Sequence, residues 1–580
     1  YTKSEKDSIG TEYYWNGNLR SRMAYKENEL DGPYEEYFIS GKLERKGTYV
    51  EGSQSGENLD YWFNGNLYQK NIYDQDGKKN GLSQEFARDG SKYLEFDFKK
   101  GNIIAYRIFD KSGKIVKTAK KKGGDFLYEG LYPDGTKSTL GLYDSKGGKE
   151  GLWEFYDKNG KLETASNYEK GVLEGKSVSY YPSGELRGET EYEEGQWNGM
   201  GSSYYINGQL RYEVAGEKGY AERQKVYHNA FGDTTDIEFY YQGDQSGWQY
   251  SYAVTGKLDY KLYMVSGTTV LQVKYDTNGI PIDTLNFYGK KTFETFYPNG
   301  QKEYNIPYVN GQAHGLATWY YGNGQISKKG EFKFGEEEGL WTNYFPNGEK
   351  SLEYRYENGS RNGKTTRYHE NGKIAETYNY LYGNLDGLDT YYNEEGIKTN
   401  IYNYEMGLRN GIAKFHDPSG KLDHVRYYSY GKIIGYSYEG KDGKLVEMIP
   451  IKDETAEVKS YFSNGKVGRE YHLAAGEFDK AYIEYYSNGQ ISEVSNYKNG
   501  SREGEFLKYY KNSKLKEKGQ YENDEAVGHH FEYYSNGTMK SDKKFLKGVL
   551  HGESKFYSKS GNLVLTRYYY NGDLISEKSA

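Results

Sequence analysis

The chain has 580 residues, of which 69 are tyrosine and 74 are glycine, and it contains no cysteine. The lack of cysteine excludes disulfide bonds, thiolate metal ligands and cysteine nucleophiles. The net charge is −7, with both signs interspersed, so the chain shows no basic stripe of the kind that nucleic-acid binding needs. No apolar run approaches the roughly 20 residues that cross a bilayer. We therefore expect no nucleic-acid partner and no transmembrane segment.

The predicted elements begin with a turn glycine that recurs along the whole chain. It occupies Gly17, Gly41 and Gly65 near the start and Gly537 and Gly561 near the end, with a mean spacing of about 24 residues and about 24 slots. The most regular copies read like "YYSNGQI" (residues 485–491). Asn-Gly favours a two-residue type I′ hairpin turn, because both central residues need a positive φ. In the text "KNSKL" a serine, Ser513, takes the glycine slot.

Other positions keep a fixed distance from the turn glycine. An aliphatic residue follows it by two residues and an aromatic residue by eight, and further glycines often stand at eleven and fifteen, as in the copy that begins at Gly184. Tyr, Phe, Trp and Thr fill the segments between, as β propensity favours. Each repeat is therefore predicted to form two short antiparallel strands and two turns. The predicted fold is all-β: an elongated single-layer antiparallel solenoid of about 24 hairpins, formed by one continuous array over residues 1–580.

Three windows keep the spacing but lose the repeat sequence: residues 101–125, 212–295 and 425–480. They are the most aliphatic parts of a hydrophilic chain, and we interpret them as bends, as better-buried repeats or as surfaces for a partner. Because exposed aliphatic clusters mark interaction sites, we expect a partner to contact residues 212–295 or 425–480, or one terminal repeat. The candidate partner-binding residues are Ile103, Ile104, Met264, Val265, Ile433, Ile434, Met448 and Ile449.

Nothing in the chain indicates an enzyme. The His-Glu-x-x-His, Gly-x-Ser-x-Gly and Walker motifs are missing, and His314, His416 and His551 fill ordinary repeat positions. Asp74, Asp157 and Asp276 begin Asp-x-Asx-Gly segments that resemble the start of a calcium loop. They lack the later ligands of such a loop, so we interpret them as turn formers. We expect no catalytic residues, no cofactor and no metal.

The text "YEEGQWNGMGSSYYINGQL" (residues 192–210) resembles the MORN repeat, whose core is an aromatic residue, Gly, three residues, Gly, one residue and Gly. Most copies here lack the last glycine, and the added Tyr-Tyr-x-Asn-Gly-x-Leu half resembles the bacterial variant of the repeat, which is often labelled antitoxin-like. The resemblance implies elongated single-layer β-sheets that serve as scaffolds and protein-binding surfaces, with occasional lipid or membrane association. It implies no catalytic residues.

The predicted function is a non-enzymatic scaffold that binds other proteins, as a subunit of a membrane-associated assembly of the bacterial cell envelope. Two rivals remain open: a carbohydrate- or cell-wall-binding module that uses the tyrosine rows, and an antitoxin- or immunity-like partner of a toxin. The chain begins at Tyr1 without methionine, so either a leader, which could include a lipid anchor, was removed ahead of it or the chain is a fragment. We expect an exported protein, in the periplasm or at the cell surface; the cytoplasm is the alternative.

Overall fold

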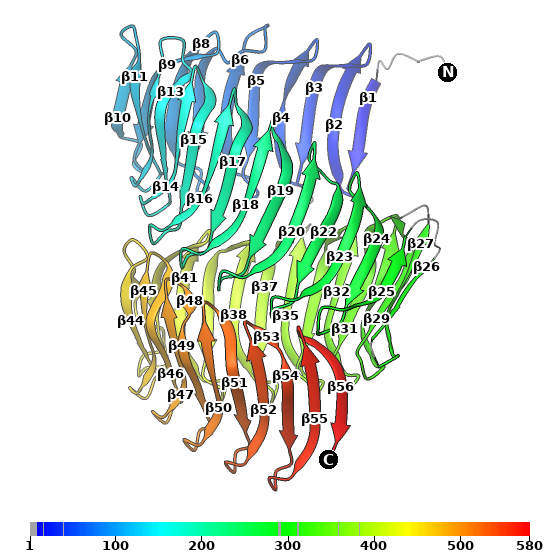
Figure 1. Cartoon of the computed structure of the whole chain (residues 1–580). Helices are drawn as coiled ribbons and strands as arrows, with labels where there is room; N and C mark the ends of the chain where they lie inside the picture. The colour runs from blue at the N-terminus through cyan, green and yellow to red at the C-terminus, as the bar shows by residue number, and fades with distance from the viewer. Residues whose placement is uncertain are drawn as a thin grey trace. The chain divides into compact units, whose positions relative to one another are not determined.

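The structure is a computed structural model that describes residues 8–14, 17–38, 40–287, 292–297, 299–309, 312–357, 359–381 and 383–580. Every regular element in these residues is a β-strand, and consecutive strands pair antiparallel through hairpins. The strands form four sheets, none of which closes into a barrel (Figure 1). The prediction of an all-β array of antiparallel hairpins is confirmed, and the number of repeats stays a prediction.

The first two sheets contain the strands β1 to β25. The first sheet consists of β1 (Ser8–Tyr13), β2 (Leu19–Lys26), β3 (Glu29–Tyr37), β4 (Leu43–Val50), β5 (Ser53–Tyr61), β6 (Leu67–Tyr73), β7 (Gly81–Phe86), β8 (Lys92–Lys99), β9 (Asn102–Phe109) and β10 (Ile115–Lys120). The second consists of β11 (Phe126–Leu131), β12 (Lys137–Tyr143), β13 (Lys149–Tyr156), β14 (Leu162–Glu169), β15 (Val172–Tyr180), β16 (Leu186–Glu193), β17 (Gln196–Tyr204), β18 (Leu210–Glu217), β19 (Tyr220–His228), β20 (Thr234–Tyr241), β21 (Asp244–Gln245), β22 (Gly247–Tyr252), β23 (Leu258–Val265), β24 (Thr268–Tyr275) and β25 (Pro281–Asn286).

The other two sheets contain β26 to β56. The third sheet consists of β26 (Thr292–Phe296), β27 (Lys302–Val309), β28 (Gln312–Ala313), β29 (Gly315–Tyr320), β30 (Ile326–Lys333), β31 (Glu336–Tyr344), β32 (Lys350–Glu357), β33 (Ser360–Arg361), β34 (Gly363–Tyr368), β35 (Ile374–Leu381), β36 (Asn384–Leu385), β37 (Gly387–Tyr392), β38 (Lys398–Glu405), β39 (Leu408–Arg409), β40 (Gly411–His416), β41 (Leu422–Ser429), β42 (Lys432–Ser437) and β43 (Ile449–Pro450). The fourth consists of β44 (Ala456–Tyr461), β45 (Val467–Ala474), β46 (Glu477–Tyr485), β47 (Ile491–Lys498), β48 (Ser501–Arg502), β49 (Gly504–Tyr509), β50 (Leu515–Glu522), β51 (Glu525–Tyr533), β52 (Met539–Leu546), β53 (Val549–Leu550), β54 (Gly552–Tyr557), β55 (Leu563–Tyr570) and β56 (Asp573–Ser579).

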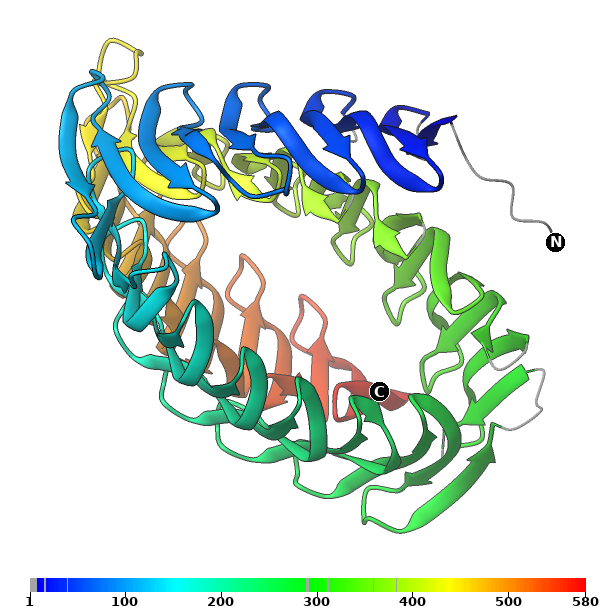
Figure 2. The same cartoon turned by 90° about the horizontal axis from the view of Figure 1, so that it is seen from above.

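The chain divides into two compact units, Tyr1–Gly201 and Ser202–Ala580, and the division falls within β17. Each sheet is a single layer in which the hairpin turns follow one another along the sheet edge (Figure 2).

The tight turn is one residue longer than the sequence predicts. In residues 486–490 the Gly489 N–H donates to the Tyr486 carbonyl at 2.7 Å, and the Tyr486 N–H donates to the Gln490 carbonyl at 2.7 Å. Gly489 has a φ of +85°, whereas Asn488 has no positive φ. This is a type I turn followed by a left-handed glycine, with a bulge in the flanking pair. The predicted type I′ turn is therefore wrong, because only the glycine needs the left-handed conformation.

The longer turn leaves the asparagine side chain free to connect neighbouring repeats. Asn488 Nδ2 donates to the Lys511 carbonyl at 3.2 Å, in the equivalent turn of the next repeat. The tyrosine that opens the turn acts in the same way: the Tyr486 hydroxyl donates to the Tyr509 carbonyl at 2.8 Å, and the Tyr510 hydroxyl to the Tyr533 carbonyl at 2.7 Å. The repeated Tyr-Tyr-x-Asn-Gly text therefore encodes a ladder of hydrogen bonds between successive turns.

The three breaks between sheets all fall within the irregular windows. They lie between β10 and β11, between β25 and β26, and between β43 and β44. In the first unit, Ile103 and Ile108 of the first sheet pack with Phe126 and Trp153 of the second. At the last break, in the second unit, other aliphatic residues form a buried cluster between the third and fourth sheets: Ile433, Ile451, Val458 and Leu473. The aliphatic residues of these two windows therefore provide the core where one sheet ends and the next begins.

Candidate functional site

The structure divides the eight candidate partner-binding residues between core and surface. Three are buried: Ile103, Met264 and Ile433. Three are exposed: Val265, Ile434 and Met448. Two are half-buried: Ile104 and Ile449. The expectation that these residues are exposed is wrong for the buried three, because successive residues of a strand point to opposite faces and only one of two neighbours can face solvent.

These residues also come from different sheets. They belong to the first, second and third sheets and to the segment before β43. Residues 288–291 of the second window lie outside the described residues. The candidates that remain available to a partner are the exposed and half-buried residues.

An exposed aliphatic row that the sequence analysis missed crosses the third sheet. Leu316 (β29), Leu340 (β31), Leu388 (β37) and Ile412 (β40) are 56%, 54%, 58% and 44% exposed. Each is followed by a residue that is buried on the opposite face: Ala317, Trp341, Asp389 and Ala413. With strands about 4.8 Å apart, members one repeat apart lie about 10 Å from each other. The row therefore runs for about 40 Å, with Lys364 in the slot between Leu340 and Leu388.

A sequence signal for this row exists. Each member directly follows the glycine fifteen residues after the turn glycine, for example Gly339 before Leu340. Leu152 and Met200 occupy the same slot in the second sheet and are also exposed. These residues belong to regular copies of the repeat and lie outside the irregular windows.

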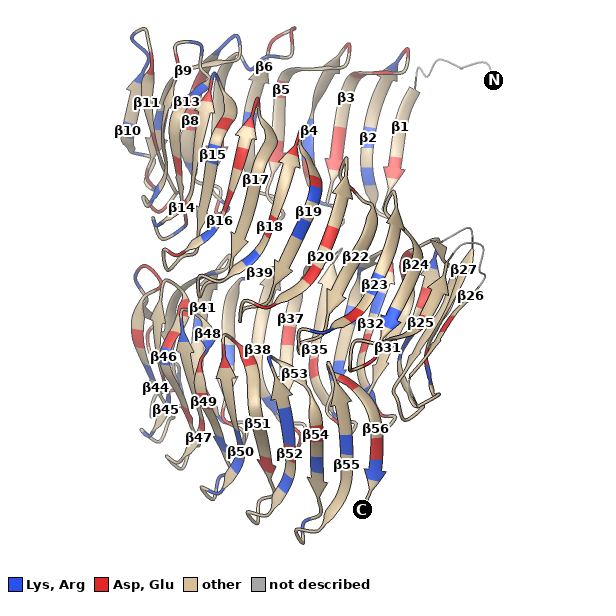
Figure 3. Ribbon diagram, viewed as in Figure 1, with Lys and Arg blue, Asp and Glu red and all other residues tan. Residues whose placement is uncertain are grey.

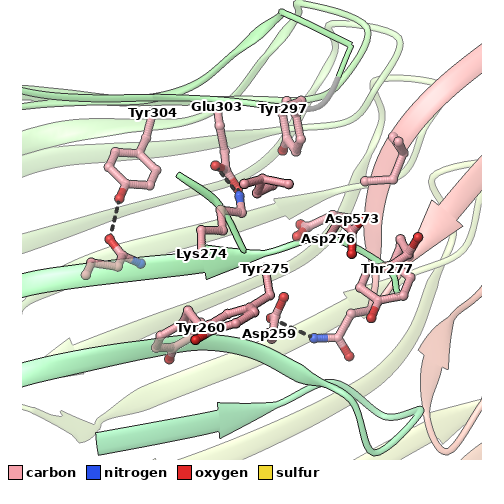
Figure 4. Close-up of a pocket in the computed structure, with 15 residues that line it drawn as sticks. Asp259, Tyr260, Lys274, Tyr275, Asp276, Thr277, Tyr297, Glu303, Tyr304 and Asp573 are labelled. Carbon is pink, nitrogen blue, oxygen red and sulfur yellow. Dashed lines mark hydrogen bonds and ion pairs between the residues drawn. The ribbon is translucent and has the colours of Figure 1, made fainter. Parts of the chain in front are cut away.

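A pocket of about 270 Å³ lies in the second unit, where strands of the second, third and fourth sheets meet (Figure 4). Lys274 on β24 forms an ion pair with Glu303 on β27. Tyr304 donates a hydrogen bond to Gln272 at 3.1 Å, also between these strands. These contacts join the second sheet to the third, so the pocket is part of a structural seam.

The carboxyl groups of this pocket outnumber its cations. Asp259, Glu303 and Asp573 face it together with Lys274. Burial raises the pKa of Asp573 to about 6, the negative charge of Glu303 adds to the rise, and Lys274 opposes it. Burial also raises the pKa of Asp259. The pocket therefore has an acidic lining that favours protonated carboxyl groups or positively charged neighbours.

The histidines singled out in the sequence contact backbone groups. His314 Nδ1 accepts from the Phe334 N–H at 3.3 Å, and His551 Nδ1 accepts from the Asn571 N–H at 3.4 Å. The corresponding slot of other repeats holds Glu174 or Asn410, whose side chains accept from the equivalent N–H. His416 lies 3.0 Å from the Thr399 carbonyl. The rings thus take part in the contacts that connect successive hairpins.

The three aspartates that resemble calcium ligands are committed to their own turns. Asp157 Oδ1 accepts from the N–H groups of Asn159 and Lys161 at 2.8 and 2.9 Å, and Asp74 and Asp276 accept in the same pattern. The interpretation as turn formers is confirmed. Within the described ranges, no group of three or more His, Asp or Glu residues could hold a metal ion.

Charges of both signs lie along the same strands (Figure 3). In the part of the chain that the structure describes, no helix is long and apolar enough to cross a membrane.

The family model described as "MORN repeat variant" matches eight segments of the chain. They are residues 30–51, 149–170, 173–194, 291–310, 313–334, 361–382, 479–499 and 502–523. The matches occur in both compact units. No curated protein matches the chain.

Solved structures similar to the chain include toxin-complex proteins. A crystal structure of TcdB2-TccC3 matches with 11% identity and a TM-score of 0.18, over 98% of this chain and 36% of that chain. A Photorhabdus luminescens Tc holotoxin pore matches with 12% identity and a TM-score of 0.18, over 98% of this chain and 34% of that chain. The chain thus spans about a third of the length of these solved chains.

Proposed function

The chain belongs to the MORN-repeat-variant family, and on that premise we propose that it is a non-enzymatic scaffold that binds other proteins, as a subunit of a bacterial cell-envelope assembly. The proposal rests on one observation, the aliphatic row on the face of the third sheet opposite its buried residues. This row is formed by Leu316, Leu340, Leu388 and Ile412. Four large apolar side chains, each about half exposed and regularly spaced, favour a partner protein with a complementary apolar strip.

The repeat structure supports this role physically. Hydrogen bonds between successive turns hold the strands in register, so that side chains one repeat apart keep a fixed spacing. A partner that matches the row contacts several repeats at once, and such a preorganised surface loses little conformational entropy on binding. Identical repeats would present a uniform surface, on which a partner could bind at several positions. Residues that differ between repeats, such as Lys364, determine the position at which the partner binds.

The location is proposed on composition. A large cysteine-free chain, rich in tyrosine, glycine and asparagine, suits an exported protein of the envelope. Fractionation of the source cells that places the protein in the cytoplasm would contradict this part of the proposal.

The experiment compares affinity capture from native membranes by the wild-type chain and by a variant with serine at Leu316, Leu340, Leu388 and Ile412. Proteins bound through the row are expected to be lost from the variant. The matched control carries Leu152→Ser and Met200→Ser, which change the same slot in the second sheet. Capture of the same proteins by all three chains would show that the row does not bind them.

A further inference from the structure

A second pocket, of about 570 Å³, lies between the third and fourth sheets of the second unit. Its volume falls within the range of about 300–1,000 Å³ that is typical of small-molecule sites. Aromatic side chains line both sides: Tyr402 and Phe415 come from the third sheet, and Tyr482 and Tyr497 from the fourth. The Arg469 guanidinium lies 5.0 Å from the centre of the Phe415 ring and 5.6 Å from that of Tyr482. Aromatic side chains offer flat apolar surfaces to a ring-shaped ligand.

Each glutamate of this pocket lies near a cation, although Lys508 is shared by Glu493 and Glu517. Five glutamates line it, and each lies within 4.0 Å of a lysine or arginine: Glu394, Glu484, Glu493, Glu517 and Glu532. Two of its cations, Arg409 and Arg426, form no ion pair with any described residue. These two guanidinium groups therefore lack a directly paired carboxylate among the described residues.

Arg426 is buried and incompletely hydrogen-bonded. It is 4% exposed, and its Nε donates to the Tyr471 hydroxyl at 2.9 Å and lies 3.2 Å from His424 Nε2, while its Nη2 has no partner. Burial and the neighbouring arginines lower the pKa of His424 well below its usual value, so this ring stays neutral and provides no counter-charge. A buried guanidinium without a carboxylate is costly, and the cost falls when an anion approaches.

The position of Arg426 departs from the repeat pattern. It stands six residues after the turn glycine, in the slot that Tyr354, Tyr378 and Tyr402 occupy in the three preceding repeats. Its guanidinium carbon lies 4.5 Å from the centre of the Phe415 ring and 4.6 Å from that of Tyr471. A charged group thus replaces a ring within an aromatic row. Ser492 also lines the pocket, and its buried hydroxyl has no hydrogen-bond partner.

Arg409 lies near the same place. Its guanidinium carbon is 4.6 Å from the centre of the Tyr402 ring, and its Nε donates to the Tyr404 hydroxyl at 3.1 Å. Burial raises the pKa of Tyr402, and the positive charges of Arg426 and Arg409 both lower it. The positive charges of both guanidinium groups therefore act at the Tyr402 ring. They would also attract an oxyanion bound at this ring.

We propose that this pocket binds an acidic saccharide, with its carboxylate or phosphate at Arg409 and Arg426 and its sugar rings against Tyr402 and Tyr482. A guanidinium pairs with oxyanions through strong, directional hydrogen bonds. The paired lysines and glutamates around it supply donors and acceptors for hydroxyl groups. The site does not depend on the scaffold role. The pocket lies between the third and fourth sheets, whereas the aliphatic row lies on the opposite face of the third sheet.

The test is calorimetric titration of the full chain with three probes: a glucuronate trisaccharide, a neutral glucose trisaccharide and glucose 6-phosphate. Binding of the glucuronate with at least about ten-fold preference over the neutral trisaccharide is expected, because a hydrogen bond to a charged group contributes about 1.5–3 kcal/mol. Binding of glucose 6-phosphate in place of the glucuronate would identify the oxyanion as a phosphate. Equal binding of the neutral sugar, or no binding of either acidic probe, would overturn the proposal.

The variants separate the site from the fold. Arg409→Gln and Arg426→Gln are each expected to weaken binding of the acidic probe about 10- to 100-fold. Arg361→Gln is the matched control: Arg361 occupies the Arg409 slot two repeats earlier and stacks on Tyr354 at 4.5 Å, outside the pocket. If Arg426→Gln does not fold, Arg409→Gln alone decides. Unchanged affinity in Arg409→Gln would overturn the assignment.

Discussion

The backbone N–H of Gly322 donates a hydrogen bond to the carbonyl oxygen of Leu574 at 2.8 Å, across more than 250 residues of sequence. Leu574 lies in β56, the last strand, and is fully buried. The neighbouring Asn299 side chain donates to the Ile575 carbonyl at 3.0 Å. The turns of the third sheet thus bind the final strand of the fourth, at a strand edge that is otherwise a template for further pairing.

This contact requires glycine at residue 322. A Cβ built there would lie 2.4 Å from the Ile575 carbonyl oxygen and 2.5 Å from that of Leu574. We expect Gly322→Ala to destabilise the docking of β56 by about 1–3 kcal/mol, as overpacking does. Hydrogen exchange of the residue 322 amide measures the effect. The control is Ser535→Ala, in the same slot of "YYSNG", and equal protection in both variants and the wild type would contradict the prediction.

Ser513 takes the glycine slot of the turn, and its φ of +63° lies in the left-handed region. Its N–H donates to the Tyr510 carbonyl at 2.8 Å, as the glycines do in other copies. We expect Ser513→Gly to stabilise the fold by about 0.5–1 kcal/mol, because glycine adopts this conformation without a Cβ penalty. Urea unfolding measures the difference. Ser535→Gly, at a position without positive φ, should instead lower stability, and a loss in both variants would refute the argument.

Ile433 and Ile434 are neighbours on β42 with opposite environments. Ile433 is 4% exposed and belongs to the apolar core at the junction of the third and fourth sheets, whereas Ile434 is 36% exposed. Ile433→Ala is expected to lower the free energy of unfolding by about 2–5 kcal/mol. Ile434→Ala should change it by less than about 0.5 kcal/mol. Thermal unfolding of the two variants measures both losses of stability. Similar losses in the two variants would contradict the assignment of Ile433 to the core and of Ile434 to the surface.

Asp389 provides a test in pH. It is 4% exposed, and burial raises its pKa to about 6, with the charge of Glu376 adding to the rise. The raised pKa means that the folded state binds more protons than the unfolded state between about pH 4 and 6. The contribution of Asp389 to stability is therefore most favourable below pH 4 and declines as the pH rises through 6.

Asp389→Asn removes this titration. We expect the variant to match the wild type near pH 4 and to exceed its stability at pH 7, by on the order of 1–3 kcal/mol. Denaturant unfolding at several pH values gives the profile. Glu349→Gln, which neutralises an exposed carboxylate, serves as the control. If the difference in the free energy of unfolding between Asp389→Asn and the wild type does not grow with pH, the titration of Asp389 does not contribute to stability as predicted.

The sequence by itself determined the class of fold and the repeat. The turn glycines, the aromatic pairs and the strand segments follow from local requirements, since a left-handed φ selects glycine and a pleated surface selects β-branched and aromatic residues. It also located the irregular windows, in which all three sheet breaks fall. The turn type was mistaken because Asn-Gly fits both hairpin geometries, and they differ in a single residue of loop length.

Only the tertiary structure decided what the irregular residues do. Ile433 is core and Ile434 is surface, although the text "KII" does not distinguish them. The partners of Gly322 and Arg426, namely Leu574 and Tyr471, lie in another sheet, 252 and 45 residues away in the sequence. Such contacts depend on how one sheet packs against the next. A repeat whose copies satisfy their hydrogen bonds with nearest neighbours does not encode that packing in its local sequence.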